Sequence, residues 1–266
     1  MAARMIRLPL ICKTCLAARI SDESETQLGN TPKIEDLLEL YELQEKGYIK
    51  FVCGAGHINF TMLQDPKFAF LFEIALNAIV DGYYREAVAT FAAALERFYE
   101  YYATIASMKN KVPEVVFNEA WKELSKQSER QLGAYLLLYL QMNEGKAPSL
   151  SSDATNMRNR VVHQGLIPTK GEAIKFGNHV LIIIRQVLEQ LYKNDIKIIH
   201  DEMFKRLRAH KAEISKTNNL DKETVISTMN SGLTLGCGDA LVAPDSIEQA
   251  LTTVQVKRNV LYQSRN

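Results

Sequence analysis

The sequence contains little that would cross-link the chain or attach it to a membrane. It has four cysteines among 266 residues, and three of them come before residue 54. So few cysteines argue against a disulfide framework, and metal binding is the first interpretation of the three near the start. Apolar runs such as residues 180–184 are far shorter than the roughly 18 residues that a membrane-spanning helix needs. The first ten residues hold too short an apolar run for a secretory signal, so we expect a cytoplasmic protein without membrane association.

The chain also lacks an excess of charge of either sign. It contains 32 lysine and arginine residues against 31 aspartate and glutamate residues, which gives a formal net charge of +1. A chain this neutral exerts no global attraction on nucleic acid, so any RNA contact requires a local basic patch or one made by dimerisation. The hydrophobic content of 47% is typical of a globular chain with a substantial core.

Two short motifs near the N-terminus contain residue types that bind zinc. Cys12 and Cys15 form a Cys-x-x-Cys motif, while Cys53 and His57 flank a glycine-rich turn. Together they offer three sulfur ligands and one nitrogen ligand, which suits a tetrahedral structural Zn²⁺. Four protein ligands leave no open position for water, which argues against a catalytic zinc. Buried cysteines beside an incidental histidine are the alternative.

Short apolar segments surround these motifs. Residues 8–11, 48–52 and 58–60 predict short strands that bring the four ligands together. Thr31-Pro32, followed by apolar residues at helical spacing up to Gly47, predicts a helix inserted between the strands. We therefore expect residues 1–62 to form a small zinc-ribbon-like domain.

The body of the chain has the pattern of a helical bundle. From Pro66 onward, apolar residues recur every three or four positions, which is the helical period. This pattern predicts helices over residues 68–80, 83–108, 113–124, 131–142 and 171–194. The helix at 131–142 is apolar almost all round, so we expect it to be central, and we expect residues 180–184 to be buried. The predicted fold class is mainly α, with short connections between helices.

One stretch in this body has chemical rather than packing potential. It places a permanent cation, a carboxamide and a titratable imidazole within six residues, as Arg158, Asn159 and His163. Candidate N-caps at 151–153 and a glycine at 165 predict a short helix that ends at His163. A helix C-terminus favours a protonated histidine. Arg158 lies about 140° around the helix from His163, so it must reach round or act with a His163 from another subunit.

The run Arg158-Asn159-Arg160-Val161-Val162-His163 resembles the signature of the HEPN superfamily, an arginine and a histidine separated by four to six residues. The resemblance covers about residues 66–200. It implies a HEPN-like helical bundle that forms a homodimer or higher homo-oligomer, in which two motifs meet at one cleft. It also implies a metal-independent endoribonuclease of toxin or antiviral-defence type, with Arg158, Asn159 and His163 as catalytic residues, RNA as substrate and a neutralising or activating protein as a further partner.

Other residues have two interpretations. Glu96 either contacts the motif or is a solvated ion-pair partner. The tyrosines either stack RNA bases or pack in the core and interface; they are Tyr83, Tyr84, Tyr99, Tyr101 and Tyr102. The basic run at 205–211 either guides RNA or forms a solvated face. Residues 201–266 form a C-terminal extension of unknown role, with helical character expected at 221–229 and 244–253.

Two non-enzymatic classes compete with the ribonuclease. One is an adaptor, in which a zinc ribbon and a helical dimer bind nucleic acid or a partner protein without catalysis. The other is a purely structural oligomerisation module. The complete Arg-Asn-x-x-x-His motif favours the enzyme, because an adaptor has no need to keep both charged groups within one helix.

Overall fold

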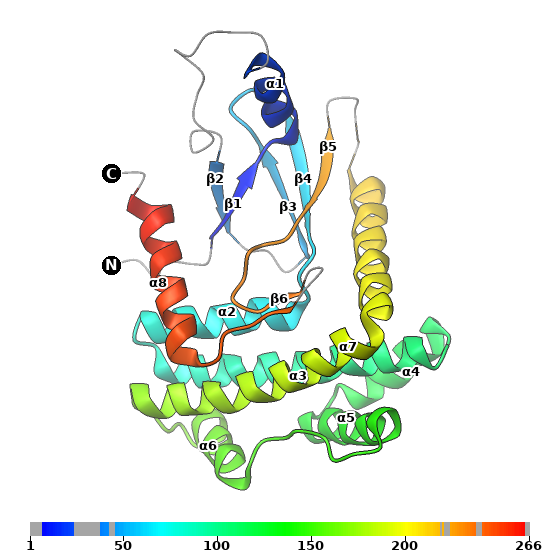
Figure 1. Ribbon diagram of the computed structural model, residues 1–266, viewed down its shortest axis with the longest axis vertical. Coiled ribbons are helices and arrows are strands. Elements are labelled where there is room, and N and C mark those ends of the chain that lie inside the picture. Colours follow the sequence, from blue (N-terminus) through cyan, green and yellow to red (C-terminus); the bar gives the residue numbers. More distant parts are fainter. Residues whose placement is uncertain are drawn as a thin grey trace. The chain divides into compact units, whose positions relative to one another are not determined.

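The computed structural model describes residues 7–23, 38–42, 46–218, 220, 224–237 and 241–263. These residues group into two compact units, each assembled from separate parts of the chain. Unit 1 takes the described residues of Met1–Gln64 and Phe204–Ser231, and unit 2 takes those of Asp65–Met203 and Gly232–Asn266. The residues that the sequence suggested as one C-terminal extension are therefore shared between the two units. Figure 1 labels the elements of both.

The first part of unit 1 is a two-stranded sheet followed by a helix. β1 (Arg7–Ile11) pairs antiparallel with β2 (Leu38–Glu42), and α1 (Lys13–Glu23) begins two residues after β1 ends. The predicted inserted helix is wrong for residues 38–42, because pairing with β1 outweighs a weak helical spacing in this segment. The rest of that prediction, at 31–37 and 43–45, lies outside the described residues.

The second part of unit 1 is a three-stranded sheet. β3 (Tyr48–Val52) and β4 (Ile58–Leu63) confirm the strands that the sequence predicted at 48–52 and 58–60, and they pair as an antiparallel hairpin. β5 (Val225–Met229) adds to β4 in parallel, so the helical prediction for residues 225–229 is wrong. Its β-branched residues favour a strand, and its partner is supplied by a segment more than 160 residues away in the sequence. Residues 221–223 lie outside the described part.

Unit 2 is mainly helical, as the sequence predicted. Its elements are α2 (Lys67–Val80), α3 (Tyr84–Lys109), α4 (Glu114–Leu124), α5 (Ser128–Asn143), α6 (Ser152–His163), the part of α7 (Lys170–Thr217) up to Met203, β6 (Gly236–Cys237), β7 (Leu241–Val242) and α8 (Ile247–Gln263). The predicted helices of the body are confirmed to within a few residues, except that the helix expected to end at 194 is continued by α7 to Thr217. Every helix in the described part of the chain is too short or too polar to span a membrane.

The core of unit 2 forms where α2, α3 and α7 pack together (Figure 1). Phe72 of α2 meets Phe91 of α3 edge-on, with 5.1 Å between the ring centroids. Gly177 allows α7 to approach closely, because a Cβ at this position would lie 2.8 Å from the Phe91 ring. Most of the predicted buried run at 180–184 is buried, although Ile182 is half-exposed. α7 also continues past residue 194, with non-helical backbone angles at Asp195.

α5 is not the central helix that its apolar composition predicted. Its buried residues, Gln131, Tyr135 and Tyr139, lie on one face. The opposite face exposes apolar side chains, namely Leu136, Leu137 and Leu140. The prediction is wrong because composition reports how many apolar residues a helix has, whereas burial depends on whether another element covers each face.

Candidate functional site

The four predicted metal ligands lie together in unit 1. Cys12 precedes α1 and Cys15 lies in its first turn, so a spacing of three residues places both thiols on one side of the chain. Cys53 and His57 flank the β3–β4 turn, where the Gly56 amide donates to the Cys53 carbonyl over 2.8 Å. Gly56 has a φ of +87°, which L side chains rarely adopt, so glycine permits this tight turn.

The spacing of these ligands fits one metal ion. All four ligand atoms lie within 4.8 Å of one another. The Nδ1 atom of His57 is 3.4 Å from the Sγ atoms of Cys15 and Cys53 and 3.7 Å from that of Cys12. The bond lengths of tetrahedral zinc require edges of about 3.6 Å between sulfur and nitrogen and about 3.8 Å between two sulfurs. The cluster therefore has the donor set and the dimensions of a metal site.

The surroundings of the cluster favour a bound cation. Burial raises the pKa of Cys12, but hydrogen bonds from the Cys15 backbone and the Asn59 side chain outweigh it and lower the pKa to about 7. Burial and the neighbouring thiols of Cys53 and Cys12 raise the pKa of Cys15 to about 12. Such crowding of thiols opposes a second negative charge unless a cation balances it. Asn59, fully buried, also donates to the His57 carbonyl over 2.8 Å and so supports the turn.

The second site surrounds α6, the helix that the motif predicted. The Ser151 hydroxyl accepts a hydrogen bond from the Ala154 amide and caps the N-terminus. At the other end, Gly165 has a φ of +72° and the Leu166 amide donates to the Arg160 carbonyl, which closes the helix. The predicted caps are confirmed, and His163 is the last residue of the helix.

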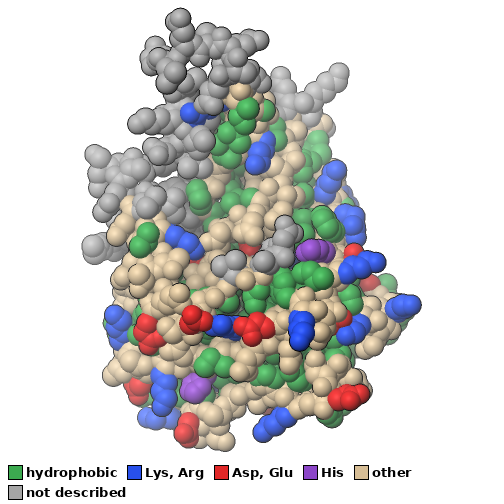
Figure 2. Space-filling view, viewed as in Figure 1, with side chains coloured by type: hydrophobic (Ala, Val, Ile, Leu, Met, Phe, Trp, Pro, Cys, Tyr) green, Lys and Arg blue, Asp and Glu red, His purple; other side chains and the backbone are tan. Residues whose placement is uncertain are grey.

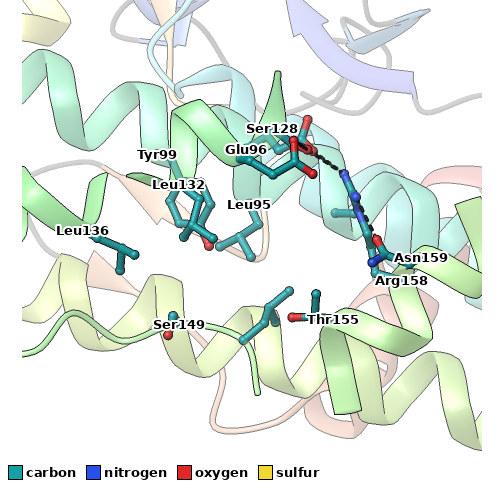
Figure 3. A pocket seen from close by; sticks show the side chains of 13 residues that line it. Leu95, Glu96, Tyr99, Ser128, Leu132, Leu136, Ser149, Thr155, Arg158 and Asn159 are labelled. Atoms are coloured by element: carbon teal, nitrogen blue, oxygen red, sulfur yellow. Dashed lines mark hydrogen bonds and ion pairs between the residues drawn. The ribbon is translucent and has the colours of Figure 1, made fainter. Parts of the chain in front are cut away.

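Arg158 points from α6 toward α3 and the start of α5 (Figure 3). Its Nη2 atom donates to Glu96 Oε1 over 2.8 Å and to the Ser128 hydroxyl over 3.3 Å. Its Nη1 atom donates to Asn159 Oδ1 over 3.0 Å. The side chain of Arg158 is 17% exposed and that of Glu96 is 27% exposed, so water only partly screens the ion pair. Of the two interpretations of Glu96, contact with the motif is therefore confirmed.

A pocket of about 200 Å³ lies beside this ion pair. Its body is apolar and is formed by Leu95, Leu132, Leu136 and Leu150, whereas Glu96, Arg158 and Asn159 make one end polar. Tyr99 also lines it and stacks on Tyr135 with 4.6 Å between ring centroids. Burial, with a contribution from the negative charge of Glu96, raises the pKa of Tyr99, so its hydroxyl stays protonated.

His163 lies outside the lining of this pocket and is exposed. Within the described residues its imidazole makes no hydrogen bond, and Asn159 bonds to Arg158 rather than to His163. The pKa of Glu129 nonetheless responds to the charges of both Arg158 and His163. A hydrogen bond with its own backbone lowers its pKa, and so do Ser128 and the positive charges of Arg158 and His163. The structure thus brings Arg158 and Asn159 together and leaves His163 apart.

Sequence reasoning did not single out Ser128 or Glu129. Both lie at the start of α5, about 30 residues before the motif, and no local pattern relates them to Arg158. Their only signal in the sequence is their position just before the helix predicted at 131–142. Their role as neighbours of the motif follows from packing of α5 beside α3 and α6, which the spacing of apolar residues does not specify.

Packing accounts for three of the five tyrosines and for part of the basic run at 205–211. Tyr99, Tyr101 and Tyr102 are buried, which confirms packing for these three, whereas Tyr83 is exposed. Figure 2 shows basic side chains along the second half of α7, where the basic run lies. Within that run Arg206 has a structural role in unit 1, because its guanidinium donates to the carbonyls of Leu63 and Gln64.

Comparison with known proteins gives no match to a family model, to a curated protein or to a solved structure. The resemblance of the motif to the HEPN signature therefore depends on the residues of α6 and on their surroundings.

Proposed function

We propose that this chain is a metal-independent endoribonuclease of toxin or antiviral-defence type, with a HEPN-like catalytic bundle in unit 2. The observation that supports this most is the arrangement of α6. This helix holds Arg158 at the polar end of a pocket and leaves His163 exposed at its C-terminal end. A phosphate-binding cation and a titratable imidazole are thus available on one helix.

The chemistry requires only groups that RNA and these residues supply. The ribose 2′-oxygen attacks the adjacent phosphorus while His163 accepts its proton, and the bond from phosphorus to the 5′-oxygen breaks. The 5′-oxygen takes up a proton, which leaves a 2′,3′-cyclic phosphate and a 5′-hydroxyl end. Arg158 stabilises the negative charge that develops on the phosphate oxygens. Three of the five N–H donors of a guanidinium are used in the described contacts of Arg158, so two are available to a phosphate.

Two copies of the chain complete the site in this proposal. Arg158 is turned toward α3, while His163 is exposed at the end of the helix. One protomer therefore binds the phosphate through Arg158 and Asn159, and the partner subunit's His163 transfers the protons. The exposed leucines of α5 offer apolar surface near the pocket, since Leu136 belongs to both.

The metal cluster has a structural role in this proposal. We assign Zn²⁺ to the four ligands Cys12, Cys15, Cys53 and His57, because cluster dimensions and donor types fit a closed tetrahedral site. When bound, the ion would join α1 to the β3–β4 turn and so stabilise the small sheets of unit 1. No catalytic step passes through it.

The decisive experiment incubates the purified full chain with total RNA and with DNA in EDTA, and maps the new ends. We expect RNA cleavage with 2′,3′-cyclic phosphate ends and intact DNA. His163→Ala and Arg158→Ala should lower the rate by about 100-fold or more. Arg160→Ala is the matched control, because Arg160 is an exposed arginine on the same helix. Cleavage by His163→Ala at the wild-type rate would contradict the proposal.

The ion pair of Arg158 with Glu96 supports a second candidate function. An arginine that joins α6 to α3 is also what a non-catalytic adaptor would use to hold its bundle together. In that case the wild-type chain would bind RNA or a partner protein without producing new ends, and Arg158→Ala would lower stability alone. The same RNA incubation, combined with a binding measurement, separates the two candidates.

A further inference from the structure

The pocket beside Arg158 is a slot whose two walls carry different kinds of side chain. Figure 3 shows Leu95, Tyr99 and Leu132 on one side of the space and Ser149 and Thr155 on the other. Glu96, Arg158 and Asn159 close one end. Such a combination of an apolar slot and a polar end suits a flat ring with hydrogen-bonding groups on one edge.

The size of the slot limits what it can accept. Its volume is about 200 Å³, and a cavity of about 150 Å³ accommodates a benzene molecule. The slot therefore has room for one nucleobase, while the ribose and phosphate attached to the base would remain at its mouth. RNA-binding proteins commonly place unstacked bases in this way and recognise their Watson–Crick edges.

The polar end offers both acceptors and donors. Arg158 occupies Glu96 Oε1, whereas Glu96 Oε2 makes no hydrogen bond within the described residues. The Oδ1 atom of Asn159 accepts from Arg158, so its Nδ2 group can still donate. A carboxylate therefore lies next to amide and guanidinium donors. Its two oxygens together can accept about four hydrogen bonds, so a base with two adjacent N–H groups would fit.

We propose that this slot binds a guanine base and that Glu96 determines the choice of base. The N1–H and N2–H groups of guanine donate to the Glu96 carboxylate, and its O6 atom accepts from Asn159 or Arg158. Adenine and cytosine have one amino donor beside a ring nitrogen whose lone pair would face the carboxylate. Uracil has a single N–H between two carbonyl oxygens. Guanine thus gains one charge-assisted hydrogen bond over each of the others.

Binding of guanine would direct cleavage next to guanosine, and this consequence rests on the proposed ribonuclease function. Because the slot holds one base of the RNA, it fixes which neighbouring phosphate of the strand reaches Arg158. The binding of guanine is nevertheless measurable without cleavage, so the two proposals can fail separately.

The first experiment measures binding of guanosine, inosine and adenosine 5′-monophosphates to the full chain by titration calorimetry. We expect guanosine monophosphate to bind about tenfold more tightly than adenosine monophosphate, the value of one hydrogen bond to a charged group. Inosine monophosphate, which lacks the N2 amino group, should lie between them. Equal affinities, a preference for adenine or no binding of any of the three would overturn the assignment.

Two pairs of variants test the residues. Glu96→Gln keeps an oxygen for Arg158 but presents an amide donor to the base, so the guanine preference should disappear. Glu100→Gln is its control, because Glu100 pairs with Arg97 and does not line the pocket. Leu132→Trp should fill the slot and abolish binding, whereas Val116→Trp, at an exposed position of α4 outside the pocket, should not. A guanine preference that survives Glu96→Gln would overturn the role of Glu96.

Mapping of the RNA ends separates this inference from the proposed function. Cleavage next to guanosine in the wild type, lost in Glu96→Gln, supports both. Cleavage without a preference among bases overturns the guanine slot and leaves the ribonuclease in place. Selective binding of guanosine monophosphate without any cleavage supports the slot and overturns the ribonuclease.

Discussion

Arg158 of α6 and Glu96 of α3 form an ion pair over 2.8 Å across 62 residues of sequence. The pair joins the motif helix to the longest helix that lies wholly within unit 2. Because both groups are partly buried, it constrains the guanidinium as well as the packing of α6. Glu96, which we propose to recognise the base, thus positions Arg158, which we propose to bind phosphate.

Removal of either partner should destabilise unit 2. We expect Glu96→Ala and Arg158→Ala each to lower the free energy of unfolding by about 1–3 kcal/mol, because each leaves a partly buried charge without its partner. The double variant should lose about 1 kcal/mol less unfolding free energy than the two single variants lose together. The reason is that the second change removes a charge that is already unpaired. Urea unfolding of the four proteins measures this coupling. Strictly additive values would show that the pair contributes nothing.

Gly177 should be intolerant of even a methyl group. A Cβ there would lie 2.8 Å from the ring of Phe91, which is fully buried, so Gly177→Ala must displace either the ring or α7. We expect a loss of about 1–3 kcal/mol of stability, as is usual for an overfilled core. Gly171→Ala, at a helical position with nothing within 4 Å, is the control and should be neutral or stabilising. Equal melting temperatures of the two variants would refute the close approach.

Loss of the metal should destabilise parts of unit 1 beyond the segments that contain its ligands. We expect Cys12→Ser to lower zinc content and to speed amide hydrogen exchange in β3, β4 and β5, because β5 depends on its pairing with β4. Exchange in α2 and α3 should change little, since they belong to unit 2. Cys237→Ser is the control, because Cys237 is not one of the four ligands. Full zinc content in Cys12→Ser would remove the assignment.

The contribution of Glu129 to stability should depend on pH. Its pKa in the folded state is lowered from about 4.5, chiefly by a hydrogen bond with its own backbone and further by Ser128, Arg158 and His163. At intermediate pH the unfolded state then binds more protons than the folded state, so stability rises with pH. The contribution is present above the ordinary carboxyl pKa and disappears as the pH falls through the lowered value.

Glu129→Gln tests this dependence. We expect the wild type to exceed the variant in its urea unfolding midpoint at pH 6, with a difference that shrinks by pH 3. Glu119→Gln controls for the change in net charge, because Glu119 is exposed on α4 and makes no hydrogen bond in the described part of the chain. A difference that stays constant between the two pH values would exclude the charge of Glu129 as its source.

Local chemistry explains the features that sequence analysis predicted correctly. The helices of unit 2 follow from apolar residues at helical spacing, and the ends of α6 follow from Ser151 and Gly165. Residue type and spacing predict the four candidate metal ligands, and the structure places their ligand atoms within 4.8 Å of one another. Each of these properties depends on residues that are close in the chain or on the fixed coordination chemistry of a metal ion.

The errors share a different physical origin. β2 and β5 are strands because partners pair with them, and α5 is half-exposed because no described element covers its leucine face. Strand pairing and burial depend on distant parts of the chain. The residues Ser128 and Glu129 gain their place beside Arg158 in the same way, through the packing of α5.

The sequence by itself determined the helical class of unit 2, the caps of the motif helix and the four residues that cluster as candidate metal ligands. Tertiary structure alone decided that Arg158 pairs with Glu96 at one end of a pocket, that His163 lies apart from them, and that the chain after Met203 contributes to both units. The reason is the distance along the chain over which each effect acts. Helical periodicity and capping act over a few neighbouring residues, whereas a site is made by side chains that packing brings together from distant helices.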